Sequence, residues 1–193
     1  PYVDLNFKPD VVSEQEALDL FKEMRSPNKR QELCTQRAHI WAYDFWRQKG
    51  LKTQKIFLFY TKRYRNREDW WFHVSPYLLV KGENGQIKEW VMDWFFFPKP
   101  MEIKEWSESF VKNGNCPIAK NHLEYLRNVS VNSRYLCFLR KDLSMYFYQP
   151  VDILRFDSVH NVIPQSWFKK ELERSMTGFD MTAEEKSSYL DKI

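Results

Sequence analysis

Three residues whose types support covalent catalysis occur in order in the first half of the chain. They are Cys34 in ELCTQRAHIW, His73 in WWFHVSPYLLV and Asp93 near the end of IKEWVMDW. A cysteine thiolate is a nucleophile, an imidazole can serve as its acid and base, and a carboxylate can orient the imidazole. Each residue also has an ordinary structural interpretation, as a buried cysteine, a histidine packed in a strand or an aspartate capping a turn. The elements that carry them decide between the two.

The segment that follows Leu33 has the apolar periodicity of a helix, and Gly50 follows it as a C-cap signal. Cys34 is therefore predicted to lie in or just before the first turn. Unpaired backbone N–H groups and the helix dipole stabilise a thiolate there, and the same groups can bind an oxyanion. The apolar stripe consists of Ala38, Trp41, Ala42 and Phe45.

Two strand-like runs, WWFHVSPYLLV and IKEWVMDW, carry His73 and Asp93 and are joined by GENGQ, a hairpin signal. A three-residue turn, closed by Lys81 and Gly85, would set His73 directly opposite Asp93. A tight Asn84-Gly85 turn would set Asp93 opposite Pro76 on the wrong face, unless a bulge corrected the slip. The sequence leaves both registers open. Pro76 also indicates an edge strand or a bulge.

The remaining patterns mix helices and strands. Ser13 and Glu16 have the spacing of a capping box at the start of the first helix. The order of helices, antiparallel strands and then mixed elements predicts an α+β fold. Helices are predicted at 13–24, 102–114, 164–175 and 182–192, strands at 53–61, 134–140 and 144–151, and a charged, mobile loop at 62–69.

Length and composition bound the class of protein. The chain has 193 residues and a net charge of +4, which fits one domain with a real core and does not favour a nucleic-acid-binding protein. No apolar run approaches the roughly 20 residues of a membrane span, and no signal peptide is visible. The chain begins at Pro1 without a methionine, which is compatible with an upstream segment that has been removed or that lies outside this sequence.

The three cysteines permit a disulfide between Cys116 and Cys137 that leaves Cys34 free, but the count alone does not establish it. His122 and His160 have no metal-ligand spacing with these cysteines, so no metal site is expected. Asn128-Val-Ser130 is a glycosylation sequon by pattern only.

The aromatic residues around the two strands are interpreted as mostly core. Part of them could wall a groove for a substrate side chain, with Trp71 and Trp94 as the candidates. Arg37, on the helix of Cys34, is expected to anchor that helix rather than to touch substrate. The aromatic cluster consists of Trp70, Trp71, Trp90, Trp94, Phe95, Phe96 and Phe97.

Taken in order, these segments resemble the bacterial protein-glutaminase family. The matching positions include Cys34, Arg37-Ala38-His39, His73-Val74, Asp93 and Ile103-Lys104-Glu105-Trp106. The resemblance covers roughly residues 30–110, and Trp94 stands where the family has a proline after its aspartate. Residues 115–193 match nothing in the pattern and are interpreted as an extension of the same single domain, 1–193.

The resemblance implies a papain/transglutaminase-like α+β fold and a catalytic triad of Cys34, His73 and Asp93. It implies deamidation of glutamine side chains in proteins or peptides through a thioester, with no cofactor and no metal. The expected partner is a protein or peptide with an exposed glutamine, not nucleic acid or a membrane, and the chain is expected to be a monomer. Secretion or a periplasmic location is expected, and a cytoplasmic one is left open. A transglutaminase, a cysteine peptidase or an inactive binding module are the alternatives.

Overall fold

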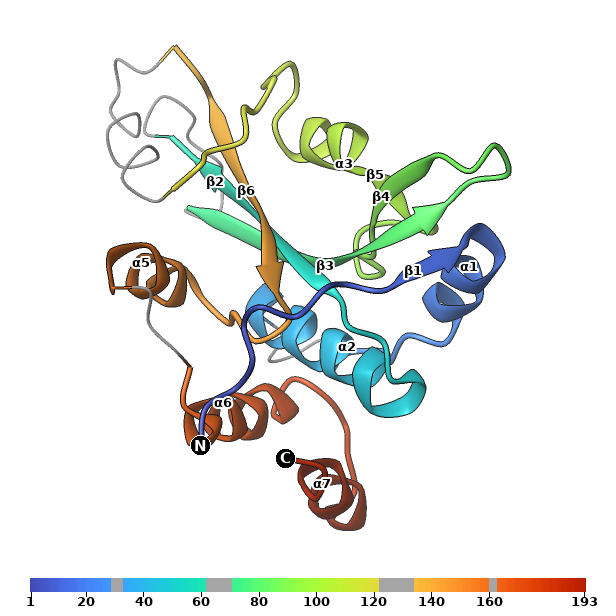
Figure 1. The fold of residues 1–193 in the computed structure, drawn as a ribbon, viewed down its shortest axis with the longest axis vertical. Helices are drawn as coiled ribbons and strands as arrows, with labels where there is room; N and C mark the ends of the chain where they lie inside the picture. The colour runs from blue at the N-terminus through green and yellow to red at the C-terminus, as the bar shows by residue number, and fades with distance from the viewer. Residues whose placement is uncertain (29–32, 62–70, 122–133, 160–162) are drawn as a thin grey trace.

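The computed structural model describes residues 1–28, 33–61, 71–121, 134–159 and 163–193. In these residues a six-stranded sheet has the order β5-β4-β3-β2-β6, and β1 pairs with β3 in parallel. Helices pack around the sheet (Figure 1). The strands are β1 (Val11–Ser13), β2 (Gln54–Tyr60), β3 (Phe72–Lys81), β4 (Ile87–Val91), β5 (Met101–Glu102) and β6 (Cys137–Ser144). The helices are α1 (Glu14–Lys22), α2 (Cys34–Lys49), α3 (Ile103–Phe110), α5 (Pro150–Val159), α6 (Gln165–Met176) and α7 (Ala183–Leu190). No helix in the described part of the chain is long and apolar enough to cross a bilayer.

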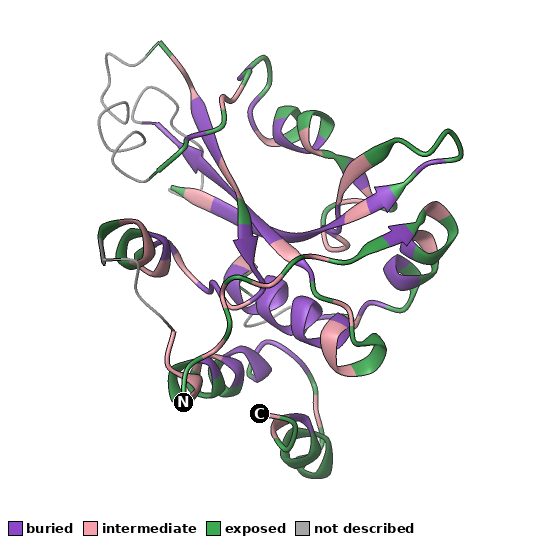
Figure 2. Ribbon diagram, in the orientation of Figure 1, coloured by how far each residue is buried: buried purple, intermediate pink, exposed green. Residues whose placement is uncertain are grey.

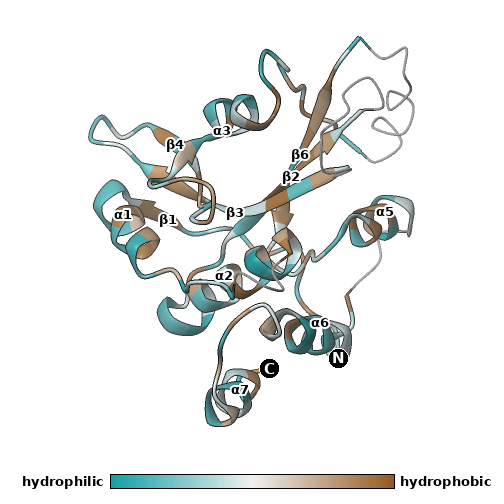
Figure 3. Ribbon diagram, turned by 180° about the vertical axis from the view of Figure 1, so that it is seen from behind, coloured by the Kyte–Doolittle hydropathy of each residue, from teal (hydrophilic) through white to brown (hydrophobic). Residues whose placement is uncertain are grey.

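The two faces of the sheet bury different helices. Along β3, Leu78 and Val80 join a cluster with Trp41 of α2, while Tyr77 joins a cluster with Trp106 of α3 on the other side. This alternation follows from the two-residue period of a strand. The helix α2 is buried along most of its length (Figure 2). Figure 3, which views the molecule from behind, shows the hydrophobic residues of the strands in brown. The nucleophile helix predicted from the sequence is thus a central element of the core.

The strand β3 is paired on both sides only in part. Residues 72–77 pair with β2, whereas pairing with β4 begins at Tyr77 and continues to Lys81. Residues 72–76 therefore form a local sheet edge on the side of β4 within the described residues. The prediction that Pro76 marks an edge strand or a bulge is wrong for the strand as a whole, because β3 is internal. Pro76 lies at the local edge, where its carbonyl accepts a hydrogen bond of 2.9 Å from the Met92 N–H.

Most predicted elements are confirmed, including α2 with its C-cap at Gly50, whose φ is 69°. The strand predicted at 144–151 is wrong. The strand β6 ends at Ser144, and α5 begins at Pro150. The carboxylate of Asp152 accepts hydrogen bonds from two backbone N–H groups just before this helix, which favours a helix start over an extended chain. The short strands β1 and β5 were not predicted. The predicted loop 62–69, the sequon at 128–130 and both His122 and His160 lie outside the described residues.

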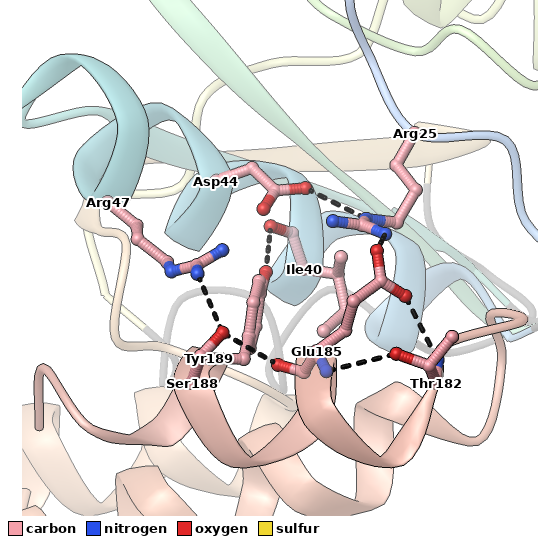
Figure 4. A network of polar contacts seen from close by, with 8 residues as sticks. All are labelled: Arg25, Ile40, Asp44, Arg47, Thr182, Glu185, Ser188 and Tyr189. Carbon is pink, nitrogen blue, oxygen red and sulfur yellow. Dashed lines mark hydrogen bonds and ion pairs between the residues drawn. The ribbon is translucent and has the colours of Figure 1, made fainter.

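The C-terminal helix α7 is bound to α2 through polar contacts (Figure 4). Tyr43 donates a 2.6 Å hydrogen bond to the Tyr189 carbonyl, and the Tyr189 hydroxyl donates to the Ile40 carbonyl at 3.2 Å. Arg47 donates to the Ser188 hydroxyl at 3.2 Å. The region that the sequence left unmatched therefore supports the helix that carries Cys34.

A disulfide joins Cys116 to Cys137, and Cys34 is a free thiol. The disulfide links the segment after α3 to β6. This is the pairing that the cysteine count allowed without establishing it.

Candidate active site

Cys34 is the first residue of α2, so its thiol lies at the positive end of that helix. The N-terminus is held by Gln36, whose Oε1 accepts the Leu33 N–H at 3.1 Å. The amide of Gln36 also donates to Thr177 Oγ1 at 3.2 Å, beyond the end of α6. The helix end that presents the thiol is thus fixed by its own side chain and by the C-terminal region.

The β3–β4 hairpin has neither of the two predicted registers. Lys81 pairs with Ile87, and the Gly82 N–H donates to the Gln86 carbonyl at 2.9 Å, so the loop lies one residue further along than the predicted three-residue turn. Both predicted registers are therefore wrong. The register that forms differs by two positions from the one that set His73 opposite Asp93, and a shift of two keeps the same face of the sheet. The side chains of His73 and Asp93 therefore lie on the same face and meet diagonally, just beyond the last paired residues of β3 and β4.

The imidazole of His73 interacts with both other residues. Its Nε2 lies 2.8 Å from Asp93 Oδ2, and His73 and Asp93 are 0% and 1% exposed. The Cys34 thiol is close enough to the imidazole for each group to shift the pKa of the other, and Nδ1 is the ring nitrogen that Asp93 does not bond. The structure therefore brings together the three residues that the sequence singled out.

The electrostatics favour a thiolate beside an imidazolium. Burial raises the pKa of the Cys34 thiol, but the hydrogen bond and charge of His73, the charge of Arg37 and a hydrogen bond from the Val74 backbone outweigh it and lower the pKa. Burial disfavours the charged form of His73, but the adjacent Asp93 carboxylate and the Cys34 thiolate raise its pKa to about 9. Both shifts favour a proton on the imidazole over a proton on the sulfur.

The Val74 backbone reaches the thiol because of the local edge of β3. Backbone groups of successive residues in a strand point to opposite sides, and the Pro76 carbonyl points toward the β4 side, where it accepts a hydrogen bond from Met92. The backbone groups of Val74 also point toward the β4 side, and on that side no strand in the described residues pairs with Val74. Its N–H is left to donate to the Cys34 sulfur.

Arg37 was predicted to anchor α2. Its guanidinium lies 4.3 Å from the Phe95 ring centroid and 5.4 Å from that of Phe96, and the side chain is buried. It therefore joins α2 to the turn that follows Asp93, through cation–π contacts. Its charge also acts on Cys34, which the sequence did not indicate.

His39, on the same helix, belongs to a separate buried pair. Its Nδ1 lies 2.7 Å from Lys55 Nζ, which also donates to the Phe147 carbonyl at 2.6 Å. Burial and the neighbouring Lys55 hold the pKa of His39 well below its ordinary value. His39 is therefore a structural residue of the core under α2.

Trp106 is the residue at the site that sequence reasoning missed. Its indole Nε1 donates to Asp93 Oδ2 at 2.9 Å, and its ring lies 5.6 Å from the His73 ring at an interplanar angle of 28°. Phe96 and Phe110 also contact the imidazole, with ring centroids at 5.2 and 4.6 Å. The tryptophan of IKEW near the start of a predicted helix, 13 residues after Asp93, was the available signal.

The aromatic cluster is less buried than the sequence suggested. Trp71 is 49% exposed and packs its ring against Phe59 and Phe72, and Trp94 is partly buried against the α2 side of the core. Most of its described members nevertheless pack partly buried against the core, as predicted, namely Trp90, Trp94, Phe95 and Phe97, whereas Trp71 and Phe96 are exposed. Exposed rings lie at the surface next to the strand of His73, while Trp70 lies outside the described residues.

In the described part of the chain, no group of three or more His, Cys, Asp or Glu residues could hold a metal ion. The site is built from a thiol, an imidazole and a carboxylate. This is the set of groups for nucleophilic acyl transfer.

Comparisons with known proteins find glutaminases similar to this chain. Residues 17–110 match a family model described as glutaminase. The NMR structure of protein-glutaminase from Chryseobacterium proteolyticum matches with a TM-score of 0.50 at 14% identity, over 84% of this chain and 85% of that one. A crystal structure of protein-glutaminase gives a TM-score of 0.50 at 13% identity, over 88% and 89% of the two chains. A crystal structure of pro-protein-glutaminase gives 0.56 at 12% identity, over 91% of this chain and 61% of that one. A comparison with curated proteins gave no match.

The fold is α+β, as predicted, and similar to that of the solved protein-glutaminase structures. The chain is thus similar to glutaminases over residues 17–110, and its fold is similar to that of solved protein-glutaminases.

Proposed function

We propose that the protein deamidates glutamine side chains in proteins or peptides, with Cys34 as nucleophile, His73 as acid and base, and Asp93 as the group that orients the imidazole. The observation that carries this proposal is the connected arrangement from thiol to imidazole to carboxylate, in which Nε2 of His73 lies 2.8 Å from Asp93 Oδ2. The glutaminase match over residues 17–110 supports glutamine as the substrate.

The first half of the reaction forms a thioester. The Cys34 thiolate attacks the carboxamide carbon of glutamine, and the oxyanion that forms is bound by backbone N–H groups at the start of α2. The His73 imidazolium gives its proton to the amide nitrogen. The carbon–nitrogen bond then breaks, ammonia leaves and the acyl group stays on sulfur.

The second half hydrolyses the thioester. His73, now neutral, takes a proton from water, and the resulting hydroxide attacks the thioester carbon. The carbon–sulfur bond breaks and the thiolate of Cys34 returns, paired again with the imidazolium. The product is a glutamate side chain, and the steps need no cofactor.

The substrate is a glutamine on a polypeptide, since the thiol at the end of α2 is partly exposed and exposed aromatic rings lie near it. Trp71 is half-exposed and adjoins the strand of His73, which supports a role in binding substrate. Trp94 is proposed with it at the same rim. A monomer suffices for this reaction, because one chain supplies all three groups.

Ammonia release from a denatured glutamine-rich protein tests the proposal, with mass spectrometry of the product. The matched variants are Cys34→Ala and Cys34→Ser, which leave the disulfide of Cys116 and Cys137 in place. Ammonia release with conversion of glutamine to glutamate, lost in both variants, is the expected result. Cross-linked product would point to a transglutaminase and cleaved product to a peptidase. A folded protein with no turnover and an unreactive Cys34 would leave a binding module.

We also propose that the protein works outside the reducing cytoplasm, in a secreted or periplasmic location. The disulfide between Cys116 and Cys137 supports this, because such bonds persist mainly in oxidising compartments. Thiol counting on protein purified from its native source, before and after reduction, tests it. Three free thiols in the unreduced native protein would contradict it.

A further inference from the structure

Asp93 accepts two hydrogen bonds on the same carboxylate oxygen. His73 Nε2 lies 2.8 Å from Oδ2 and Trp106 Nε1 lies 2.9 Å from it, and the two donors come from different elements, β3 and α3. Asp93 and Trp106 are 1% and 0% exposed, so water does not compete for this oxygen. The carboxylate is therefore fixed in rotation by the protein alone.

The chemistry of the second donor determines how the proton is shared. An indole N–H donates and has no acceptor capacity, so the oxygen that faces it must be an acceptor. An Oδ2 already bonded by Trp106 then receives a second N–H from His73, which sets Nε2 as the protonated nitrogen. The other nitrogen of His73, Nδ1, is left to exchange the proton with Cys34.

The indole also confines the imidazole. Its ring lies 5.6 Å from the His73 ring at an angle of 28°, close to parallel. Phe110, one helical turn further along α3, contacts the imidazole at 4.6 Å and the Trp106 ring at 5.6 Å. The helix α3 thus forms one wall of the site and aims a hydrogen-bond donor from it.

The position of α3 is itself fixed on both sides. Trp106 packs in the core cluster beneath the sheet, and the segment after α3 is joined to β6 by the disulfide of Cys116 and Cys137. The indole therefore occupies a defined place before substrate binds. A preorganised donor of this kind contributes without any movement during the reaction.

We propose that Trp106 is a positioning residue of the deamidation reaction, which acts through its hydrogen bond to Asp93 and its contact with the His73 ring and does not touch substrate. This inference rests on the proposed function for its reaction. The observation that supports this inference is that Asp93 Oδ2 accepts hydrogen bonds from both His73 and Trp106.

The test compares Trp106→Phe with Trp41→Phe as the matched control. Trp41 is also buried and also loses one hydrogen bond, from its Nε1 to the Arg25 carbonyl at 2.8 Å, but it lies on α2 two turns beyond Cys34. Trp106→Phe is expected to lower kcat by about ten- to a hundredfold with little change in KM, the range typical of groups that orient a reacting side chain. Trp41→Phe is expected to leave kcat near the wild-type value.

A double-mutant cycle with Asp93→Asn separates positioning from general damage. If Trp106 acts through Asp93, Trp106→Phe has little further effect once the carboxylate is gone. An equal loss of kcat in both backgrounds, or a loss no larger than that of Trp41→Phe, would overturn the proposal. If Trp106→Phe does not fold, benzothienylalanine at position 106, in which sulfur replaces the N–H in a ring of the same shape, gives the same comparison.

The failure of the proposed function is distinguishable from the failure of this inference. If the wild-type protein releases no ammonia, the function fails, but the alkylation rate of Cys34 still reports how His73 is held. Slower alkylation in Trp106→Phe than in Trp41→Phe, with the difference lost in Asp93→Asn, supports the positioning role. Equal rates in the two tryptophan variants overturn it.

Discussion

Replacing Asp93 by asparagine removes the negative charge beside His73 and keeps a side chain of nearly the same size. The carboxylate is the main favourable influence on the imidazolium, whose pKa it helps to raise from 6.5 to about 9 against the effect of burial. A displacement of that size corresponds to about 3 kcal/mol of preference for the charged form. Once the charge is gone, only Cys34 opposes the effect of burial, so the pKa of His73 is expected to fall and less imidazolium to be present at neutral pH.

The loss is expected to reach the thiol. The charge and hydrogen bond of His73 lower the pKa of Cys34, so a neutral imidazole leaves a protonated thiol. In the wild-type protein, thiolate is present from the lowered pKa of Cys34 upward, and the acid needed for ammonia release is lost as the pH rises through about 9. At neutral pH, deamidation by Asp93→Asn is expected to fall by roughly a hundredfold, the rate equivalent of about 3 kcal/mol.

The assay is the rate of alkylation by iodoacetamide as a function of pH. With Cys116 and Cys137 in a disulfide, Cys34 is the thiol that reacts. Asp93→Asn is expected to lose the reactivity below neutral pH and to follow a thiol with a pKa of ~8.5 or higher. Asp44→Asn is the matched control, because Asp44 is also buried and lies 3.5 Å from Arg25, ten residues along α2 from Cys34. Identical alkylation profiles for wild type and Asp93→Asn would refute the reasoning.

Three further outcomes are expected. Arg37→Gln removes a positive charge that lowers the pKa of Cys34, so the pKa of the thiol should rise and its alkylation at acid pH should slow. An unchanged pH profile of alkylation would contradict this role of Arg37. Reduction of the Cys116–Cys137 disulfide should lower the free energy of unfolding by about 3 kcal/mol in denaturant titration, since its loop spans 21 residues. Ser13→Ala removes the acceptor of the Glu16 N–H and should cost ~1 kcal/mol in the same titration without changing kcat.

The sequence by itself determined the elements and the three chemical groups. The apolar stripe behind Cys34 and the C-cap at Gly50 depend on local periodicity and backbone sterics, and α2 begins at Cys34 and ends before Gly50, as they predict. The same is true of the hairpin, because turn residues between two apolar runs are a short-range signal. At 144–151 the alternation of apolar residues predicted a strand. The chain there instead leads into a helix, because the Asp152 carboxylate accepts hydrogen bonds from backbone N–H groups just before it.

Only the tertiary structure decided how these groups meet. The register of β3 and β4 depends on which loop residues close the turn, and a change of one residue would have put Asp93 on the opposite face from His73. The bond from Trp106 to Asp93 depends on α3 packing under the sheet, and the Val74 N–H reaches Cys34 because β4 pairs with β3 only from Tyr77 onward. Each of these contacts joins segments that are distant along the chain. Their geometry is set by packing of the whole core, which no local window of sequence contains.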